Sequence, residues 1–193
     1  LEFGAELGRG ANFPGAEGNR NGVGSAALFA HAGGDVGASH SWRAGLSYLR
    51  SSPRDRAYDD TGLNGATVSN SFSGTSKLWL ADLVWKWAPE GNAARNYWQL
   101  QGEYFRRRET GALTYDTATT ATTDAYRSTQ SGWYAQGVYQ FLPQWRVGLR
   151  RDQLDSGRVD YGLNNANLAR PDHAPSKNSV MFDYNPSEFS RVR

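Results

Sequence analysis

Segments of roughly ten residues that alternate apolar and polar side chains recur along the chain. Successive side chains of a strand point to opposite faces, so this pattern predicts strands with one apolar and one polar face. Within 40–50, for example, Trp42, Leu46 and Tyr48 share one side, whereas Arg43 and Ser47 share the other. The predicted strands are 1–9, 26–32, 40–50, 77–88, 96–107, 132–141, 145–152 and 179–185, with a further strand beginning near Phe189.

The connections between these strands alternate in length. The short ones (33–39, 89–95, 142–144 and 186–188) are rich in turn-forming residues, whereas the long ones (10–22, 51–76, 108–131 and 153–178) are polar. Short turns at one end and long extracellular loops at the other are typical of a transmembrane β-barrel. The fold class predicted is all-β, an antiparallel transmembrane β-barrel, with 1–193 forming a single segment of about eight to nine strands from a larger barrel.

The aromatic residues support this prediction by their position. All seven tryptophans fall on the apolar side of their strands and cluster near strand ends. Trp42, Trp85, Trp87, Trp98 and Trp145 lie toward the short turns, and Tyr48, Trp79, Tyr104 and Trp133 lie toward the long loops. Small and aliphatic residues lie between the two groups, as in a lipid-facing wall with aromatic belts at both interfaces. A soluble barrel would instead fill the middle of its strands with the large rings.

The opposite side of the strands is predicted to line the lumen. It carries Arg43, Asp82, Lys86, Gln99, Gln101, Glu103, Gln136, Gln140, Arg146 and Arg150. These polar groups suit a water-filled pore. They could equally pair across neighbouring strands and brace the wall. Because both signs of charge are present, ion selectivity stays open.

Composition excludes several other classes of protein. The chain has no cysteine, so disulfide scaffolds and thiolate metal sites are excluded. Its formal net charge of +2 offers no field for nucleic acid. No apolar run approaches the ~18 to 20 residues of a spanning helix. The three histidines lack metal-ligand spacing, and no catalytic or nucleotide-binding motif occurs, so neither an enzyme, a metal site nor a cofactor is expected.

Four cations lie on the apolar side of their strands, just beyond the aromatic belt that is nearer the long loops, here called the upper belt: Arg50, Lys77, Arg106 and Arg151. Charge facing outward is costly within hydrocarbon but cheap at the interface. Transmembrane β-barrels of this type occur in bacterial outer membranes. The outer leaflet of such a membrane contains lipopolysaccharide, whose phosphates Arg and Lys bind through charge-assisted hydrogen bonds. The sequence therefore predicts a lipid A phosphate site along this rim. The alternative is that these side chains simply snorkel to water.

Three stretches carry a resemblance to a known family: SAALFAHAGGDVG (25–37), ASHSWRAGLSYL (38–49) and DYNPSEFSRVR (183–193). They resemble Gram-negative outer-membrane proteins described as porin-like proteins or zinc-regulated TonB-dependent receptors. The resemblance implies a barrel of the bacterial outer membrane, of which this chain would be an internal piece without signal peptide or closing strand. A zinc-scavenging role finds no support, because the long loops hold only His173.

The function expected is a porin-like channel for passive transport of small hydrophilic solutes. A TonB-dependent receptor that takes up a metal or siderophore is the first alternative, and a surface adhesin or structural barrel is the second. The partners expected are outer-membrane lipid and lipopolysaccharide, small polar solutes, further copies in a homotrimer if the protein is a porin, and TonB if it is a receptor.

Overall fold

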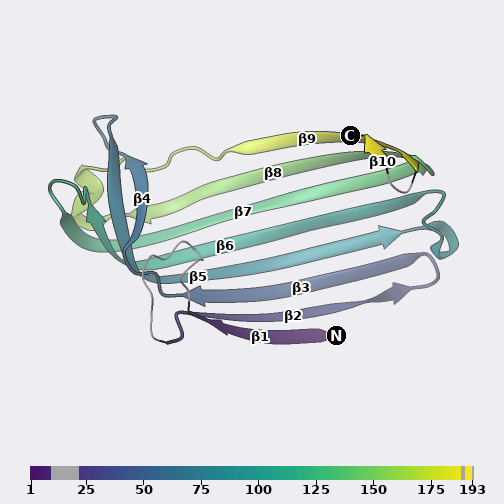
Figure 1. Ribbon diagram of the computed structural model, residues 1–193, viewed down its shortest axis with the longest axis horizontal. Coiled ribbons are helices and arrows are strands. Elements are labelled where there is room, and N and C mark those ends of the chain that lie inside the picture. Colours follow the sequence, from purple (N-terminus) through teal and green to yellow (C-terminus); the bar gives the residue numbers. More distant parts are fainter. Residues whose placement is uncertain (10–21, 188–189, 193) are drawn as a thin grey trace.

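The computed structural model describes residues 1–9, 22–187 and 190–192, which form one curved, antiparallel sheet of ten strands (Figure 1). The strands are β1 (Glu2–Gly8), β2 (Ser25–Val36), β3 (His40–Ser51), β4 (Arg56–Thr61), β5 (Thr67–Trp87), β6 (Tyr97–Tyr115), β7 (Thr122–Leu142), β8 (Trp145–Asp160), β9 (Ser176–Ser187) and β10 (Ser190–Val192). They pair in chain order except that β4 pairs only with β5. Among the described residues β1 and β10 do not pair with each other, so the sheet is open. The predicted antiparallel all-β fold is confirmed.

The register merges the apolar sides of the strands into one continuous surface, here called the apolar face. Trp42 lies opposite Trp85, Ala44 opposite Leu83, Leu46 opposite Ala81 and Tyr48 opposite Trp79. Directly opposite residues share a face of the sheet. Leu46 and Leu83 each keep 52% of their surface exposed. The apolar face is therefore not a buried protein core, and an exposed apolar surface of this kind marks an interaction surface for lipid or protein.

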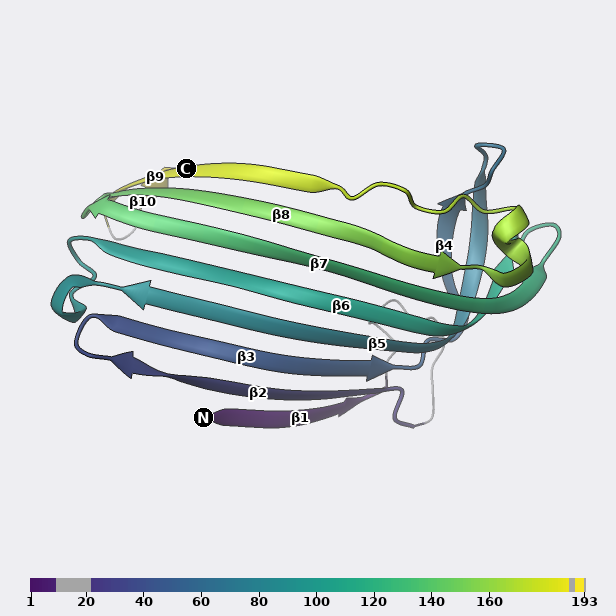
Figure 2. The same cartoon turned by 180° about the vertical axis from the view of Figure 1, so that it is seen from behind.

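The two ends of the sheet differ, as Figures 1 and 2 show. At one end the strands are joined by tight connections such as 37–39 and 143–144 and by a short 3-10 turn at Pro89–Gly91. At the other end the hairpin of β4 and β5 rises steeply from the sheet, close to a second 3-10 turn at Gly162–Ala166. Among the described residues no helix is long and apolar enough to span a membrane.

The predicted long loops are wrong in their extent. Most of 108–131 is strand, and only 116–121 connects β6 to β7. The range 51–76 contains β4 and the start of β5, and 153–178 contains the end of β8 and the start of β9. The range 10–22 lies outside the described residues apart from Gly22, and residue 188 of the turn at 186–188 also lies outside them.

The sequence predicts loops for these strand segments because the apolar residues change to the other side of the strands beyond the upper belt. Phe72, Leu113 and Tyr126 belong to the side that is polar further down, and they are buried there. With Tyr161 and Leu168 they form the hydrophobic core of a cap at this end of the sheet. The backbone pairing of the strands continues into this cap. The apolar residues, however, lie there on the opposite side of the strands from those that identified the strands in the sequence.

Candidate functional site

The register places all predicted pore-lining residues on the same side of the sheet, here called the polar face. Asp82 lies opposite Glu103, Lys86 opposite Gln99, and Gln101 opposite Gln136. Arg43 lies opposite Val84, Arg150 opposite Gln136, and Arg146 opposite Gln140. The strands thus bring together residues that are far apart in sequence. That this face lines a pore stays a prediction.

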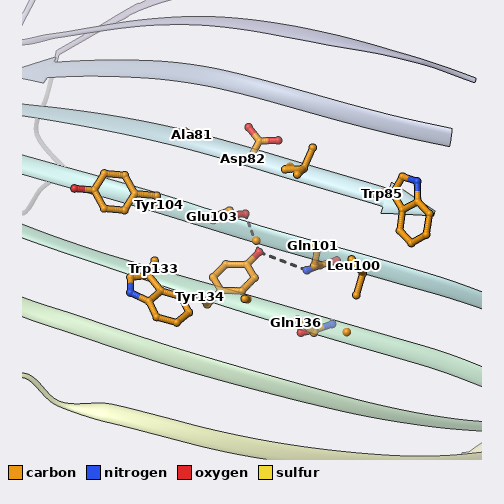
Figure 3. Close-up of a pocket in the computed structure, with 14 residues that line it drawn as sticks. Ala81, Asp82, Trp85, Leu100, Gln101, Glu103, Tyr104, Trp133, Tyr134 and Gln136 are labelled. Atoms are coloured by element: carbon orange, nitrogen blue, oxygen red, sulfur yellow. Dashed lines mark hydrogen bonds between the residues drawn. The ribbon is translucent and has the colours of Figure 1, made fainter. Parts of the chain in front are cut away.

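A hydrogen-bonded group centred on Tyr134 occupies the middle of the polar face (Figure 3). The Tyr134 hydroxyl donates to Glu103 Oε1 at 3.0 Å and accepts from Gln101 Nε2 at 3.4 Å. The Arg150 guanidinium lies 3.8 Å from the centre of the Tyr134 ring and binds Asp152 at 2.6 Å. Tyr134 and Asp152 were not among the predicted site residues, although their strand parity already indicated this face.

Other polar-face residues brace the wall near the short turns. The Gln140 side-chain amide donates to the carbonyl oxygens of Ala93 and Ala94 at 3.1 and 3.2 Å. Arg146 donates to the Tyr97 hydroxyl at 3.3 Å and lies 3.9 Å from the fully buried carboxylate of Asp183. Gln140 and Arg146 therefore contact other parts of the wall, and that they also line a pore stays a prediction.

Arg43 and Lys86 differ from these braced residues because they remain exposed on the polar face. The Arg43 side chain is 56% exposed and its nearest carboxylate, Glu2, is 4.0 Å away. Lys86 forms no ion pair with any described residue. Asp35 is also exposed on this face, so both signs of charge reach the solvent.

The polar face carries a histidine, His31, that lies near two carboxylates. His31 Nε2 lies 3.5 Å from Asp82 Oδ2, and its Nδ1 lies 3.8 Å from Glu2 Oε2. Within the part of the chain that the structure describes, no group of three or more His, Asp or Glu side chains is arranged to hold a metal ion.

The apolar face gathers the predicted belt residues in cross-strand pairs. The rings of Tyr48 and Trp79 are 4.6 Å apart, and the ring of Trp145 stacks on Tyr184 at 4.3 Å. The remaining pairs are Trp42 with Trp85, Trp87 with Trp98, and Tyr104 with Trp133. A hollow of about 790 Å³ lies in this part of the sheet, lined in part by Trp85, Leu100, Tyr104 and Trp133 (Figure 3). The position of the belt residues at the headgroup level of a bilayer stays a prediction.

The predicted cations beyond the upper aromatic residues do not all lie together. Lys77 lies opposite Arg50 on one side and opposite Arg108 on the other, and Arg106 is on the same face. Arg151 lies apart, opposite Ala135 and Asn178, and donates to Gln153 at 3.4 Å. Arg108 was missed because only one cation per strand was considered, although it shares the parity of Arg106.

Comparison with known proteins bears on this two-faced sheet. The family model described as phosphate-selective porin O and P matches residues 36–190. The chain belongs to this family. Phosphate-selective porins O and P are outer-membrane proteins, which agrees with the predicted location and with the resemblance to porin-like proteins. The match gives no support to the TonB-dependent receptor type.

One relative is a protein of Aquifex aeolicus (strain VF5) described as uncharacterized. It is 30% identical over 159 residues, which make up 82% of this chain and 30% of the relative. The chain therefore spans about a third of the length of this member of the comparison. No solved structure shows a significant match to the chain.

Proposed function

We propose that the chain forms part of the wall of a passive outer-membrane channel for small hydrophilic solutes, with its polar face toward the water-filled lumen. One observation carries the proposal: a single register puts the charged and amide side chains on one face and exposed leucines between aromatic rings on the other. A wall between lipid and water requires this division. Membership of a porin family supports the same function.

The family description suggests phosphate as a solute of this channel. Arg and Lys side chains bind phosphate oxygens through charge-assisted hydrogen bonds. Arg43 and Lys86 are the polar-face cations best placed for this, since both are exposed and neither is held in a close ion pair. Arg146 is less accessible, since its side chain is only 24% exposed and donates to the Tyr97 hydroxyl, and Arg150 is paired with Asp152 at 2.6 Å. Assembly as a homotrimer is a further part of the porin proposal.

The proposal predicts that Arg43 and Lys86 influence ion selectivity. Replacing both with Glu in the full-length protein should shift the reversal potential in planar bilayers toward cations and reduce phosphate current, because fixed charges beside a pore set its local field. Arg151→Glu is the control, since this residue is exposed on the apolar face. It should leave the reversal potential unchanged. An equal shift from Arg151→Glu, or no current through the wild-type protein, would contradict the proposal.

A further inference from the structure

A cluster of cations lies on the apolar face just beyond the upper aromatic residues. Lys77 of β5 is directly opposite Arg108 of β6, and Trp79 is directly opposite Arg106. These four residues and Thr110 line a hollow of about 600 Å³. Arg50 continues the row onto β3. The three cations Lys77, Arg106 and Arg108 are called here the cation cluster.

The cation cluster lacks acidic partners. Its three side chains are exposed, and none forms an ion pair with any residue in 1–9, 22–187 or 190–192. Like charges directly opposite each other destabilise a sheet. A bound anion would offset the repulsion between Lys77 and Arg108. The polar face shows the contrast, because Arg150 there has its own carboxylate in Asp152.

An apolar hollow continues from the cation cluster along the same strands. On β5, Ala81 and Leu83 follow Trp79 on the apolar face, and on β6 Tyr104 and Gly102 follow Arg106 toward the short turns. Ala81, Leu83, Tyr104 and Gly102 line the hollow of about 790 Å³ together with Ala135 and Gly137 of β7. The polar-face residues that alternate with them along these strands also border it: Asp82, Gln101, Glu103, Tyr134 and Gln136. Gly102 adds no side chain to the hollow, and a Cβ at this position would come within 2.9 Å of the Tyr134 carbonyl oxygen.

From this arrangement we propose that the cation cluster and the apolar hollow together bind one phosphorylated lipid of the outer leaflet, of the lipid A type. The headgroup phosphate would contact Lys77, Arg106 and Arg108, and an acyl chain would lie in the hollow beside Tyr104 and Leu100. A free phosphate ion shares the headgroup chemistry but has no use for the apolar hollow. This site is on the face away from the proposed lumen and does not depend on conduction.

The test measures thermal unfolding of the full-length protein in phosphatidylcholine bilayers. Three additions are compared: bisphosphorylated lipid A, dephosphorylated lipid A with the same acyl chains, and inorganic phosphate. The bisphosphorylated lipid should raise the Tm most. The variant K77Q/R106Q/R108Q should lose that additional increase. The control R43Q/K86Q/R95Q, which removes three exposed cations elsewhere, should keep it.

Two results would overturn the proposal. Equal Tm increases from the phosphorylated and dephosphorylated lipids would show that the cations only snorkel to water. Equal protection by inorganic phosphate that is lost in K77Q/R106Q/R108Q and kept in R43Q/K86Q/R95Q would show that the cation cluster is a site for free anions. If the triple variant fails to fold, the single variant Arg108→Gln replaces it, with lipid A retained per protein measured by native mass spectrometry. Retention should fall for Arg108→Gln and for Ala81→Phe, which fills the hollow, and unchanged retention in both would refute the site.

Discussion

Glu109→Ala should destabilise the cap by about 3–5 kcal/mol, the cost of removing one member of a buried ion pair. Glu109 is 1% exposed. Its two carboxylate oxygens accept hydrogen bonds from Arg56 Nη1 and Nη2 at 2.8 and 2.9 Å. The Arg56 guanidinium also lies 4.9 Å from the centre of the Phe72 ring, so the pair is attached to the core of the cap. Loss of the carboxylate leaves the Arg56 charge in a site built around it.

Hydrogen exchange of the backbone amides around Leu113 in the full-length protein measures this opening free energy. The double variant R56M/E109L should recover most of the loss, because a packed apolar pair can replace a buried ion pair. Asp172→Ala, at a fully solvated loop position, is the matched surface control. A loss for Glu109→Ala no larger than that of the control would contradict the assigned role.

The same measurement across pH has a definite sign. Burial alone would raise the pKa of Glu109, but the hydrogen bond from Arg56 and the charges of Arg107 and Arg56 hold this pKa below its ordinary value. A folded-state pKa below the unfolded value means that the stabilisation is complete above the unfolded pKa and is lost as the pH falls through the folded pKa. The cap of Glu109→Gln should lack this part of the acid sensitivity.

Leu83→Arg should cost about 2–4 kcal/mol in a lipid bilayer if the apolar face is the lipid face, because the variant would then put a charge near the midplane. Leu83 lies between Ala44 and Gly102 on the apolar face and is flanked along β5 by Trp79 and Trp85 toward the two strand ends. The same cost is expected for Arg at Leu46 or Leu100.

Gln136→Arg is the matched control for Leu83→Arg because it introduces the same charge on the polar face. Its neighbour Arg150 is already paired with Asp152, so repulsion is limited and the cost should be far smaller. Refolding titrations of the full-length variants in lipid vesicles give both free energies. Equal costs would mean that the two faces have been assigned wrongly.

The sequence was sufficient for the strands between the predicted aromatic belts because the two sides of those strands differ in polarity. Trp42, Leu83 and Leu100 lie on one face, and Arg43 and Gln101 lie on the other. That contrast repeats every second residue, so it can be read without knowing which strands pair. Pairing then followed the chain order, as it does in an antiparallel barrel.

The cap could not be predicted in the same way. Leu113 and Tyr126 belong to the side of their strands that carries charges nearer the short turns, and Ala112 and Ala125 beside them weaken the alternation further. If only the alternation that puts apolar residues on the apolar face is followed, these segments are therefore interpreted as loops. The Arg56 and Glu109 pair is separated by 53 positions, and no local pattern joins them. A second search for alternation of the opposite phase would have found Leu113, Tyr115 and Tyr126.

The most direct test of the two-faced wall uses the absence of cysteine from this chain. Single cysteines at Leu100, Gln101, Glu103 and Tyr104 of β6 are introduced into the full-length protein after any cysteine outside this chain has been replaced by serine, and intact outer membranes are treated with a small, water-soluble thiol reagent. Labelling should be strong at 101 and 103, which face the lumen, and weak at 100 and 104, which face lipid. Equal labelling at all four positions, or strong labelling at 100 and 104 alone, would contradict the account.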